Sequence, residues 1–169
     1  FVFREAVNHG FTNWDDPNYI LENEELTLFT WDNVKDQFSS YYFGNYHPIT
    51  MVSYLIEYHF GQLDPKIYHL DNILLHLLNT ALVFILFYKF SGKISIAAIV
   101  CVLFGIHPMH VESVAWVSER KDMLYASFFL LSLIFYTDYI SKGAKNYKKY
   151  ALVLLFFILS LLSKAMAVT

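Results

Sequence analysis

The chain has 169 residues, of which 56% are hydrophobic, 19% aromatic and 16% charged. Soluble domains average about 45–50% apolar and about 25% charged residues, so this composition excludes a disordered or fibrous chain and favours a membrane protein. The net charge of −3 lacks the basic excess of nucleic-acid-binding proteins, so we expect no nucleic-acid partner. A single cysteine, Cys101, excludes an internal disulfide and a multi-cysteine zinc site.

Residues 1–64 form a long polar segment that we expect to lie outside the membrane. Residues 1–71 hold eleven of the fifteen acidic residues and only three of the twelve basic ones. An apolar stretch at 49–60 lies between His47-Pro48 and Gly61, which predicts a twelve-residue helix. A spanning helix needs about 20 residues, so we expect this one to be an interfacial helix, in a region where aromatic residues are common.

The rest of the chain, residues 65–169, predicts an all-α, polytopic transmembrane bundle. Asp64-Pro65 marks a helix start and Ser91-Gly92 a helix stop, which sets the limits of the first span. The apolar runs and their flanking residues predict four spans, at 65–90, 94–106, 123–140 and 147–167.

Between the second and third spans we expect a polar outer loop at 107–122. His107-Pro108 ends the second span, and Ser118 is a candidate N-cap for the third. The two other connections collect six of the twelve basic residues: Lys89, Lys93, Lys142, Lys145, Lys148 and Lys149. The positive-inside rule places those two connections in the cytoplasm, and therefore residues 1–64 and 107–122 on the non-cytoplasmic side.

Asp15 and Asp16 are candidate catalytic residues in the first outer segment. Adjacent carboxylates repel each other, so such a pair either holds a proton at a raised pKa or binds a divalent cation such as Mg²⁺ or Mn²⁺. It can then act as a general base toward an incoming hydroxyl. The alternative is a simple turn, because the residues of Asp15-Asp16-Pro17-Asn18 all favour turns.

Arg120 and Lys121 are candidate phosphate-binding residues in the second outer segment. A guanidinium suits a lipid-linked phosphate because it stays charged and donates bidentate hydrogen bonds. Glu119 and Asp122 flank the two cations. The alternative is a charged membrane border that anchors the next helix.

His107 and His110 lie in the same segment, followed by Glu112. Their spacing suits metal ligation on one helical face. They are alternatively histidines that stabilise the loop or contact a donor substrate. The spacing leaves these alternatives open.

Four ordered motifs resemble one known family. They are GFTNWDDPNYI at 10–20, YHPIT at 46–50, HLDNILLH at 69–76 and HPMHVESVAWVSERKD at 107–122, and the ending SLLSKAMAV at 160–168 is also similar. Together they resemble the membrane half of the tetratricopeptide-repeat transmembrane O-mannosyltransferases, particularly the bacterial members. The resemblance extends over essentially the whole chain.

The resemblance implies a GT-C glycosyltransferase, which takes a sugar from a polyprenyl or dolichyl phosphate. It implies that Asp15 is the catalytic base and that Asp16 assists it or binds a cation. It further implies that Arg120, and less directly Lys121, contacts the donor phosphate. The residues expected around that phosphate are His107, His110, Glu112, Glu119 and Asp122.

We therefore expect an integral membrane enzyme that transfers a sugar, mannose by the resemblance, to a protein Ser or Thr hydroxyl. Its location is the bacterial inner membrane, or the endoplasmic reticulum membrane in a eukaryote. The family carries further membrane helices and a C-terminal repeat array, so we expect this chain to be a fragment that is inactive alone. The alternative function is a non-catalytic membrane scaffold whose repeats recruit partners.

Overall fold

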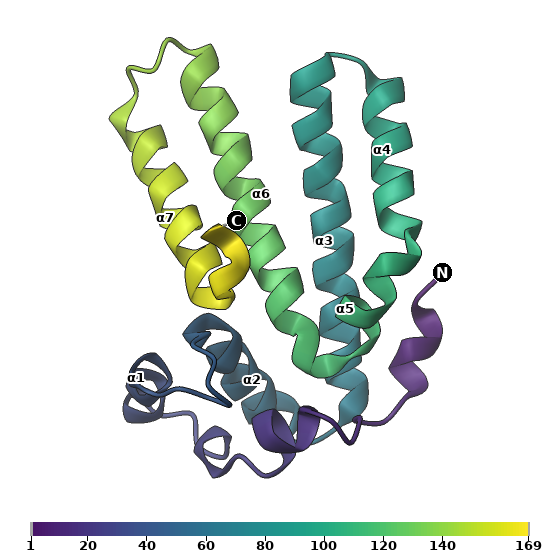
Figure 1. Ribbon diagram of the computed structural model, residues 1–169, viewed down its shortest axis with the longest axis vertical. Coiled ribbons are helices and arrows are strands. Elements are labelled where there is room, and N and C mark those ends of the chain that lie inside the picture. The colour runs from purple at the N-terminus through teal and green to yellow at the C-terminus, as the bar shows by residue number, and fades with distance from the viewer. Residues whose placement is uncertain (1, 169) are drawn as a thin grey trace.

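The computed structural model describes residues 2–168, and the regular secondary structure in that range is helical apart from one isolated bridge between Tyr42 and Asn45. Four long helices form two antiparallel hairpins, which contact each other through the first helix of each (Figure 1). The hairpins consist of α3 (Pro65–Ser91) with α4 (Ile94–Ile106), and α6 (Arg120–Ser141) with α7 (Tyr147–Ser163). The prediction of an all-α fold is confirmed for the described residues.

The limits of α3 follow from local sequence. The Asp64 side chain caps the helix by accepting a hydrogen bond from the Lys66 backbone N–H at 3.1 Å, and Pro65 occupies the first helical position. Gly92 ends the helix in the left-handed conformation, with φ at 64° and its N–H bonded to the Tyr88 carbonyl at 2.9 Å. Glycine adopts this conformation without the Cβ clash of other residues.

The segment 107–122 is largely helical, so the prediction of a loop was wrong. It contains η4 (Pro108–His110), α5 (Val111–Ala115) and η5 (Val117–Glu119), and α6 begins at Arg120. Ser118 does not cap α6, whose N-cap residue is Glu119. The Ser118 hydroxyl instead donates to a buried carboxylate, that of Asp16, and a charged acceptor makes a stronger hydrogen bond than a backbone group.

Two helices are long and apolar enough to cross a membrane, Pro65–Ser91 and Val117–Ser141. A third span results if Ile94–Ile106 and Pro108–Ala115, bent by 48°, act as one. The helix at the predicted span 147–167 is shorter than predicted. It is α7, which ends at Ser163, and the chain then turns into η6 (Ala165–Val168). The described residues therefore support an integral membrane protein with two or three candidate spans.

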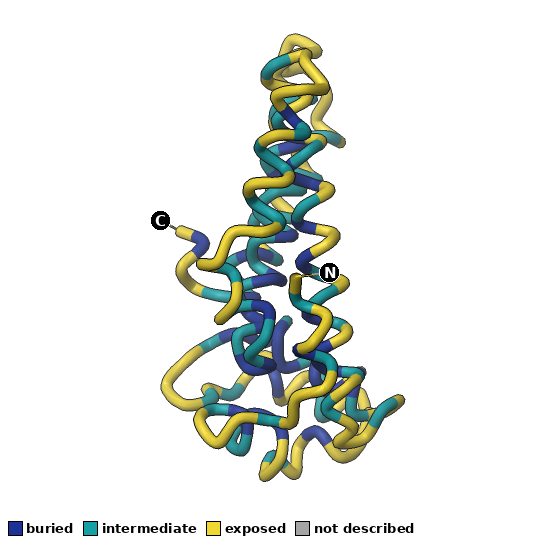
Figure 2. Tube along the Cα trace, turned by 90° about the vertical axis from the view of Figure 1, so that its right-hand side faces the viewer, coloured by how far each residue is buried: buried dark blue, intermediate teal, exposed yellow. Residues whose placement is uncertain are grey.

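Residues 2–64 pack across one end of the bundle, beside the segment 107–122 (Figure 1). The basic connections lie at the opposite end, where Asp138 of α6 is paired with Lys89 of α3 and with Lys149 of α7, the latter at 3.4 Å. Figure 2 shows that buried positions concentrate at the end that holds residues 2–64. The elements of that segment are η1 (Arg4–Asn8), η2 (Pro17–Leu21), η3 (Glu24–Leu26), α1 (Trp31–Ser39) and α2 (Pro48–Gly61).

The helix predicted at 49–60 is α2, and one of its faces is buried in the protein. Met51, Tyr54 and Leu55 are fully buried in a hydrophobic cluster with residues of η2, η3, α3 and η5. The Thr50 hydroxyl donates to the Ser163 carbonyl at 3.0 Å, which satisfies a carbonyl in the last turn of α7. Helix α2 therefore joins the outer segment to both hairpins.

Candidate functional site

The Asp16 carboxylate connects the two outer segments. Its Oδ2 accepts hydrogen bonds from the Thr12 backbone N–H at 2.7 Å and from the Thr12 hydroxyl at 3.0 Å. Its Oδ1 accepts from the Ser118 backbone N–H at 3.0 Å and from the Ser118 hydroxyl. Asp16 is fully buried, so its carboxylate is held by four hydrogen bonds in a fixed position.

Asp15 differs from its neighbour. It is partly exposed, and among residues 2–168 its carboxylate has no hydrogen-bond or ion-pair partner. Its backbone carbonyl accepts from the Asn18 and Tyr19 N–H groups at 3.1 and 3.0 Å, which begins the turn into η2. Asp15 thus takes part in the predicted turn through its backbone while its carboxylate makes no bond within residues 2–168. The hydrogen bonds of the neighbouring Asp16 hold the backbone of Asp15 in place.

Trp14, which precedes Asp15 in the chain, and Trp116 also bring the same two segments together. Their ring centroids lie 5.3 Å apart with an interplanar angle of 80°, the edge-to-face arrangement that aromatic pairs prefer. The Trp14 side chain remains 70% exposed. The Trp116 carbonyl accepts a hydrogen bond from Asn72 Nδ2 at 3.2 Å.

Arg120 is buried, and its guanidinium is bound within the protein. Both terminal nitrogens donate to the Glu57 carboxylate, one of them at 2.9 Å, and Nε donates to Asn72 Oδ1 at 2.8 Å. A fourth bond runs to the Tyr68 carbonyl at 2.9 Å. The guanidinium carbon lies 4.9 Å from the centre of the Tyr54 ring. Four of the five N–H donors are therefore used inside the protein.

The predicted role of Arg120 in binding a donor phosphate stays a prediction. Only one terminal N–H is left free, so a phosphate that binds both terminal nitrogens has to displace Glu57. Burial raises the pKa of Glu57 to about 7, although the guanidinium opposes that rise. Glu57 and Asn72 are site residues that the sequence analysis missed, since nothing in the local sequence links them to Arg120.

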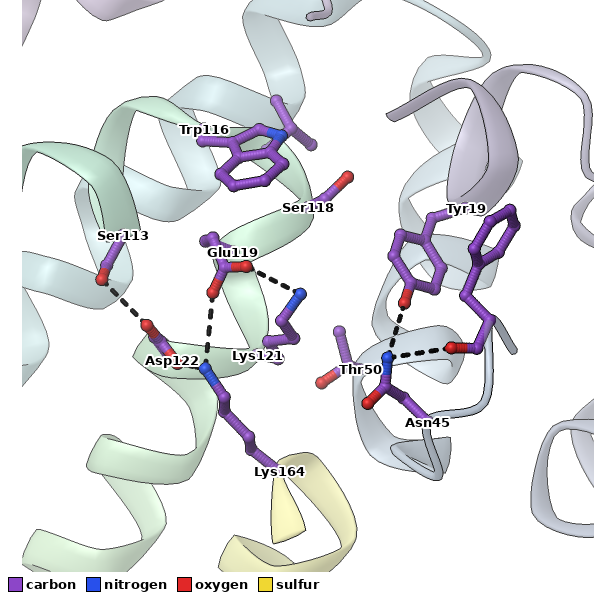
Figure 3. A network of polar contacts seen from close by, with 12 residues as sticks. Tyr19, Asn45, Thr50, Ser113, Trp116, Ser118, Glu119, Lys121, Asp122 and Lys164 are labelled. Atoms are coloured by element: carbon purple, nitrogen blue, oxygen red, sulfur yellow. Dashed lines mark hydrogen bonds and ion pairs between the residues drawn. The ribbon is translucent and has the colours of Figure 1, made fainter. Parts of the chain in front are cut away.

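Lys121 and the flanking acids form an ion-pair network at the start of α6 (Figure 3). Lys121 Nζ lies 2.8 Å from one carboxylate oxygen of Glu119, and Lys164 Nζ lies 3.4 Å from the other. Lys164 is also paired with Asp122, which accepts a hydrogen bond from the Ser113 hydroxyl at 3.0 Å. Lys164 belongs to the recognised motif 160–168, but the sequence analysis assigned it no role in the site.

His47 lies near this network and is electrically neutral at pH 7. Burial, together with the nearby positive charges of Lys121 and Lys164, lowers the pKa of His47 to about 4. Its ring packs against Tyr19 at a centroid distance of 5.2 Å. The Tyr19 hydroxyl in turn lies 3.3 Å from Asn45 Nδ2 (Figure 3).

The histidines of the second segment have local structural roles. His107 Nδ1 accepts a hydrogen bond from the Met109 N–H at 3.2 Å, and the His110 ring packs on Phe104 at 4.4 Å between centroids. Glu112 is exposed. Within residues 2–168 no three or more His, Cys, Asp or Glu residues are placed to hold a metal ion. This geometry favours loop-stabilising histidines over the alternative of metal ligation.

Comparison with known proteins identifies relatives along most of the chain. Protein O-mannosyl-transferase TMTC3 of Homo sapiens is 32% identical over 152 residues, which is 81% of this chain. Protein O-mannosyl-transferase tmtc2 of Xenopus laevis is 34% identical over 139 residues, 76% of this chain. The chain belongs to the family of these protein O-mannosyl-transferases. The resemblance found in the motifs is thereby confirmed.

The family assignment covers only one part of these larger proteins. The chain spans 15% of the length of the human relative and 16% of the Xenopus laevis one. A third family member, protein O-mannosyl-transferase Tmtc1 of Drosophila melanogaster, is 27% identical over 99% of this chain, which spans 20% of its length. No family model and no solved structure matches the chain.

Proposed function

We propose that this chain belongs to a membrane O-glycosyltransferase that transfers mannose from a polyprenyl- or dolichyl-phosphate donor to a protein Ser or Thr hydroxyl on the non-cytoplasmic side. The observation that carries the proposal is the Asp15 carboxylate, which has no partner among the described residues 2–168 and lies next to a firmly bound Asp16 at the junction of two outer segments. The printed names of the relatives, all protein O-mannosyl-transferases, support the reaction class.

In this proposal Asp15 is the general base. The acceptor hydroxyl gives its proton to the Asp15 carboxylate while its oxygen attacks the anomeric carbon of the sugar. The bond between that carbon and the donor phosphate oxygen breaks, and the lipid phosphate leaves with the bonding electrons. A general base must stay within hydrogen-bond distance of the proton that it accepts. The four hydrogen bonds of Asp16 fix the backbone beside Asp15 and so hold the base in position.

The proposed contacts of the donor phosphate are Arg120 and Lys121, with His107 and His110 nearby. Both cations are paired with carboxylates in this structure, Arg120 with Glu57 and Lys121 with Glu119. A phosphate that replaced either carboxylate would keep the charge sign and accept hydrogen bonds from the same donors.

No step of the proposed reaction is assigned to a divalent cation. The Asp16 carboxylate, one of the two expected ligands, already accepts four hydrogen bonds. Among residues 2–168 no ligand set of three or more residues surrounds Asp15. The proton transfer at Asp15 requires only the carboxylate itself.

The replacement Asp15→Asn tests this proposal in the complete protein. Asparagine keeps the shape of the side chain and removes its basicity, so we expect mannosyl transfer from polyprenyl-phosphate mannose to an acceptor peptide to fall about 10²–10⁴-fold. Asp32→Asn is the matched control, because Asp32 is an exposed acid of the same segment with a single exposed partner, Lys35. Undiminished transfer by Asp15→Asn would contradict the assigned base, and no transfer by the unmodified protein would favour the scaffold alternative.

A further inference from the structure

The aromatic pair next to Asp15 points to a contact with the transferred sugar. We propose that the Trp14 ring stacks on the apolar face of the donor's sugar, and that Trp116 holds Trp14 in position. This inference rests on the proposed function and adds to it the residue that recognises the sugar.

The exposure of Trp14 is the first observation. A side chain that is 70% exposed leaves most of a large apolar ring in contact with water, which is unfavourable unless a ligand, a partner or a membrane covers it. Trp14 directly precedes Asp15, and consecutive Cα atoms lie about 3.8 Å apart. A sugar ring on Trp14 therefore lies within reach of the Asp15 carboxylate.

The second observation is that the exposed ring is held. Its edge-to-face contact with Trp116, at 5.3 Å and 80°, restricts its rotation. The backbone of Trp116 is held by the hydrogen bond from Asn72 to its carbonyl. An aromatic ring that is already ordered loses little conformational entropy when a ligand binds, so it is suited to recognition.

Trp116 supplies a third observation. Its indole Nε1 is buried and has no hydrogen-bond partner among residues 2–168. Buried donors are paired in most proteins, and an unpaired one calls for an explanation. A sugar hydroxyl beside the Trp14–Trp116 pair is an acceptor of the right chemistry for this N–H.

Trp31 provides a matched comparison within the same outer segment. It is 79% exposed at the start of α1, and within the described residues it has no aromatic ring contact. Exposed tryptophans of this kind are common where proteins meet the membrane interface. Trp14 differs from Trp31 by its ring partner and by its position beside a free carboxylate.

The test measures lipid binding by the complete protein in lipid nanodiscs with two probes, polyprenyl-phosphate mannose and polyprenyl phosphate without a sugar. We expect Trp14→Ala to weaken binding of the mannosylated lipid about tenfold, the size of one aromatic contact, and to leave binding of the bare lipid unchanged. Trp14→Phe retains an aromatic face and should recover most of the lost affinity. Trp31→Ala should change neither affinity.

Other results separate this inference from the function on which it rests. Unchanged binding of the mannosylated lipid by Trp14→Ala, or equal weakening of both lipids, would overturn the sugar contact and leave the proposed reaction standing. Equal losses with Trp14→Ala and Trp31→Ala would assign both tryptophans to the membrane interface. An unmodified protein that binds neither lipid would overturn the proposed function together with this inference.

Discussion

The Asp16 carboxylate accepts hydrogen bonds from both the backbone N–H and the hydroxyl of Ser118, a residue 102 positions further along the chain. This contact fixes the first outer segment against the second. It also separates the two neighbouring acids, because Asp16 is committed to structure while Asp15 keeps an unpartnered carboxylate.

Asp16→Ala should destabilise the protein by about 3 kcal/mol, because it removes a charged acceptor and leaves the buried Ser118 N–H without a partner. Asp15→Ala should change stability by less than about 0.5 kcal/mol, because the Asp15 carboxylate makes no hydrogen bond or ion pair within residues 2–168. Chemical unfolding of the two variants in detergent micelles would measure this contrast. Equal stability of both variants would show that Asp16 does not join the segments.

The Arg120–Glu57 pair predicts strongly non-additive substitutions. Arg120→Met alone leaves a buried carboxylate unpaired and should cost about 3–5 kcal/mol, whereas the double variant Arg120→Met/Glu57→Leu should cost much less. A double-mutant cycle from unfolding measurements gives the coupling. Additive effects would mean that the two side chains are not paired in solution. Because the double variant also removes the guanidinium, its binding of polyprenyl phosphate tests the predicted phosphate role of Arg120.

His47 predicts a loss of stability in mild acid. The pKa of His47 is lowered to about 4 in the folded protein, against about 6.5 for an unfolded chain. Between these values the unfolded chain binds a proton that the folded protein does not, so stability falls as the pH falls from about 6.5 to about 4. The contribution lost at pH 5 is about 2 kcal/mol.

The matched variant for this prediction is His47→Phe, which removes the titrating group and keeps an aromatic ring against Tyr19. Its unfolding free energy should change less between pH 7 and pH 5 than that of the unmodified protein. An identical pH dependence in the two proteins would assign acid sensitivity to other groups.

Gly92→Ala should destabilise the first hairpin by about 1 kcal/mol. Gly92 has φ at 64° with nothing within 4 Å of an added Cβ, so the cost comes from the backbone conformation and not from a clash. Gly10→Ala is the control, because Gly10 has equally open surroundings without a positive φ. Thermal unfolding of both variants distinguishes them, and a neutral Gly92→Ala would refute the left-handed helix end.

Local signals in the sequence predicted the helix limits well. Asp64-Pro65 and Gly92 act through bonds within one turn of helix, so the residues that start and stop α3 are visible in its own sequence. Apolar runs extended by their flanking residues also predicted a span within each long candidate, at 65–90 and 123–140. The start of α6 at Arg120 and the end of α7 at Ser163 were less predictable. Each lies beside a contact with a distant segment, Ser118 with Asp16 and Ser163 with Thr50.

The partners inside the candidate site were beyond prediction for the same reason. Arg120 was recognised as unusual, but its partner Glu57 lies 63 positions earlier in a different helix. Ser118 has the sequence signature of an N-cap, and tertiary bonding to Asp16 overrides that local preference. Pairings of this kind depend on three-dimensional proximity, which composition and spacing along one segment do not encode.

The hydrogen bond from Thr50 to Ser163 has a consequence for biosynthesis. Its two ends lie 113 positions apart, so the start of α2 cannot dock until the end of α7 has left the ribosome. The contact of Asp16 with Ser118 imposes the same order on the first outer segment. Residues 2–64 are thus made before the segments against which they pack, and their apolar surfaces stay exposed until those segments emerge.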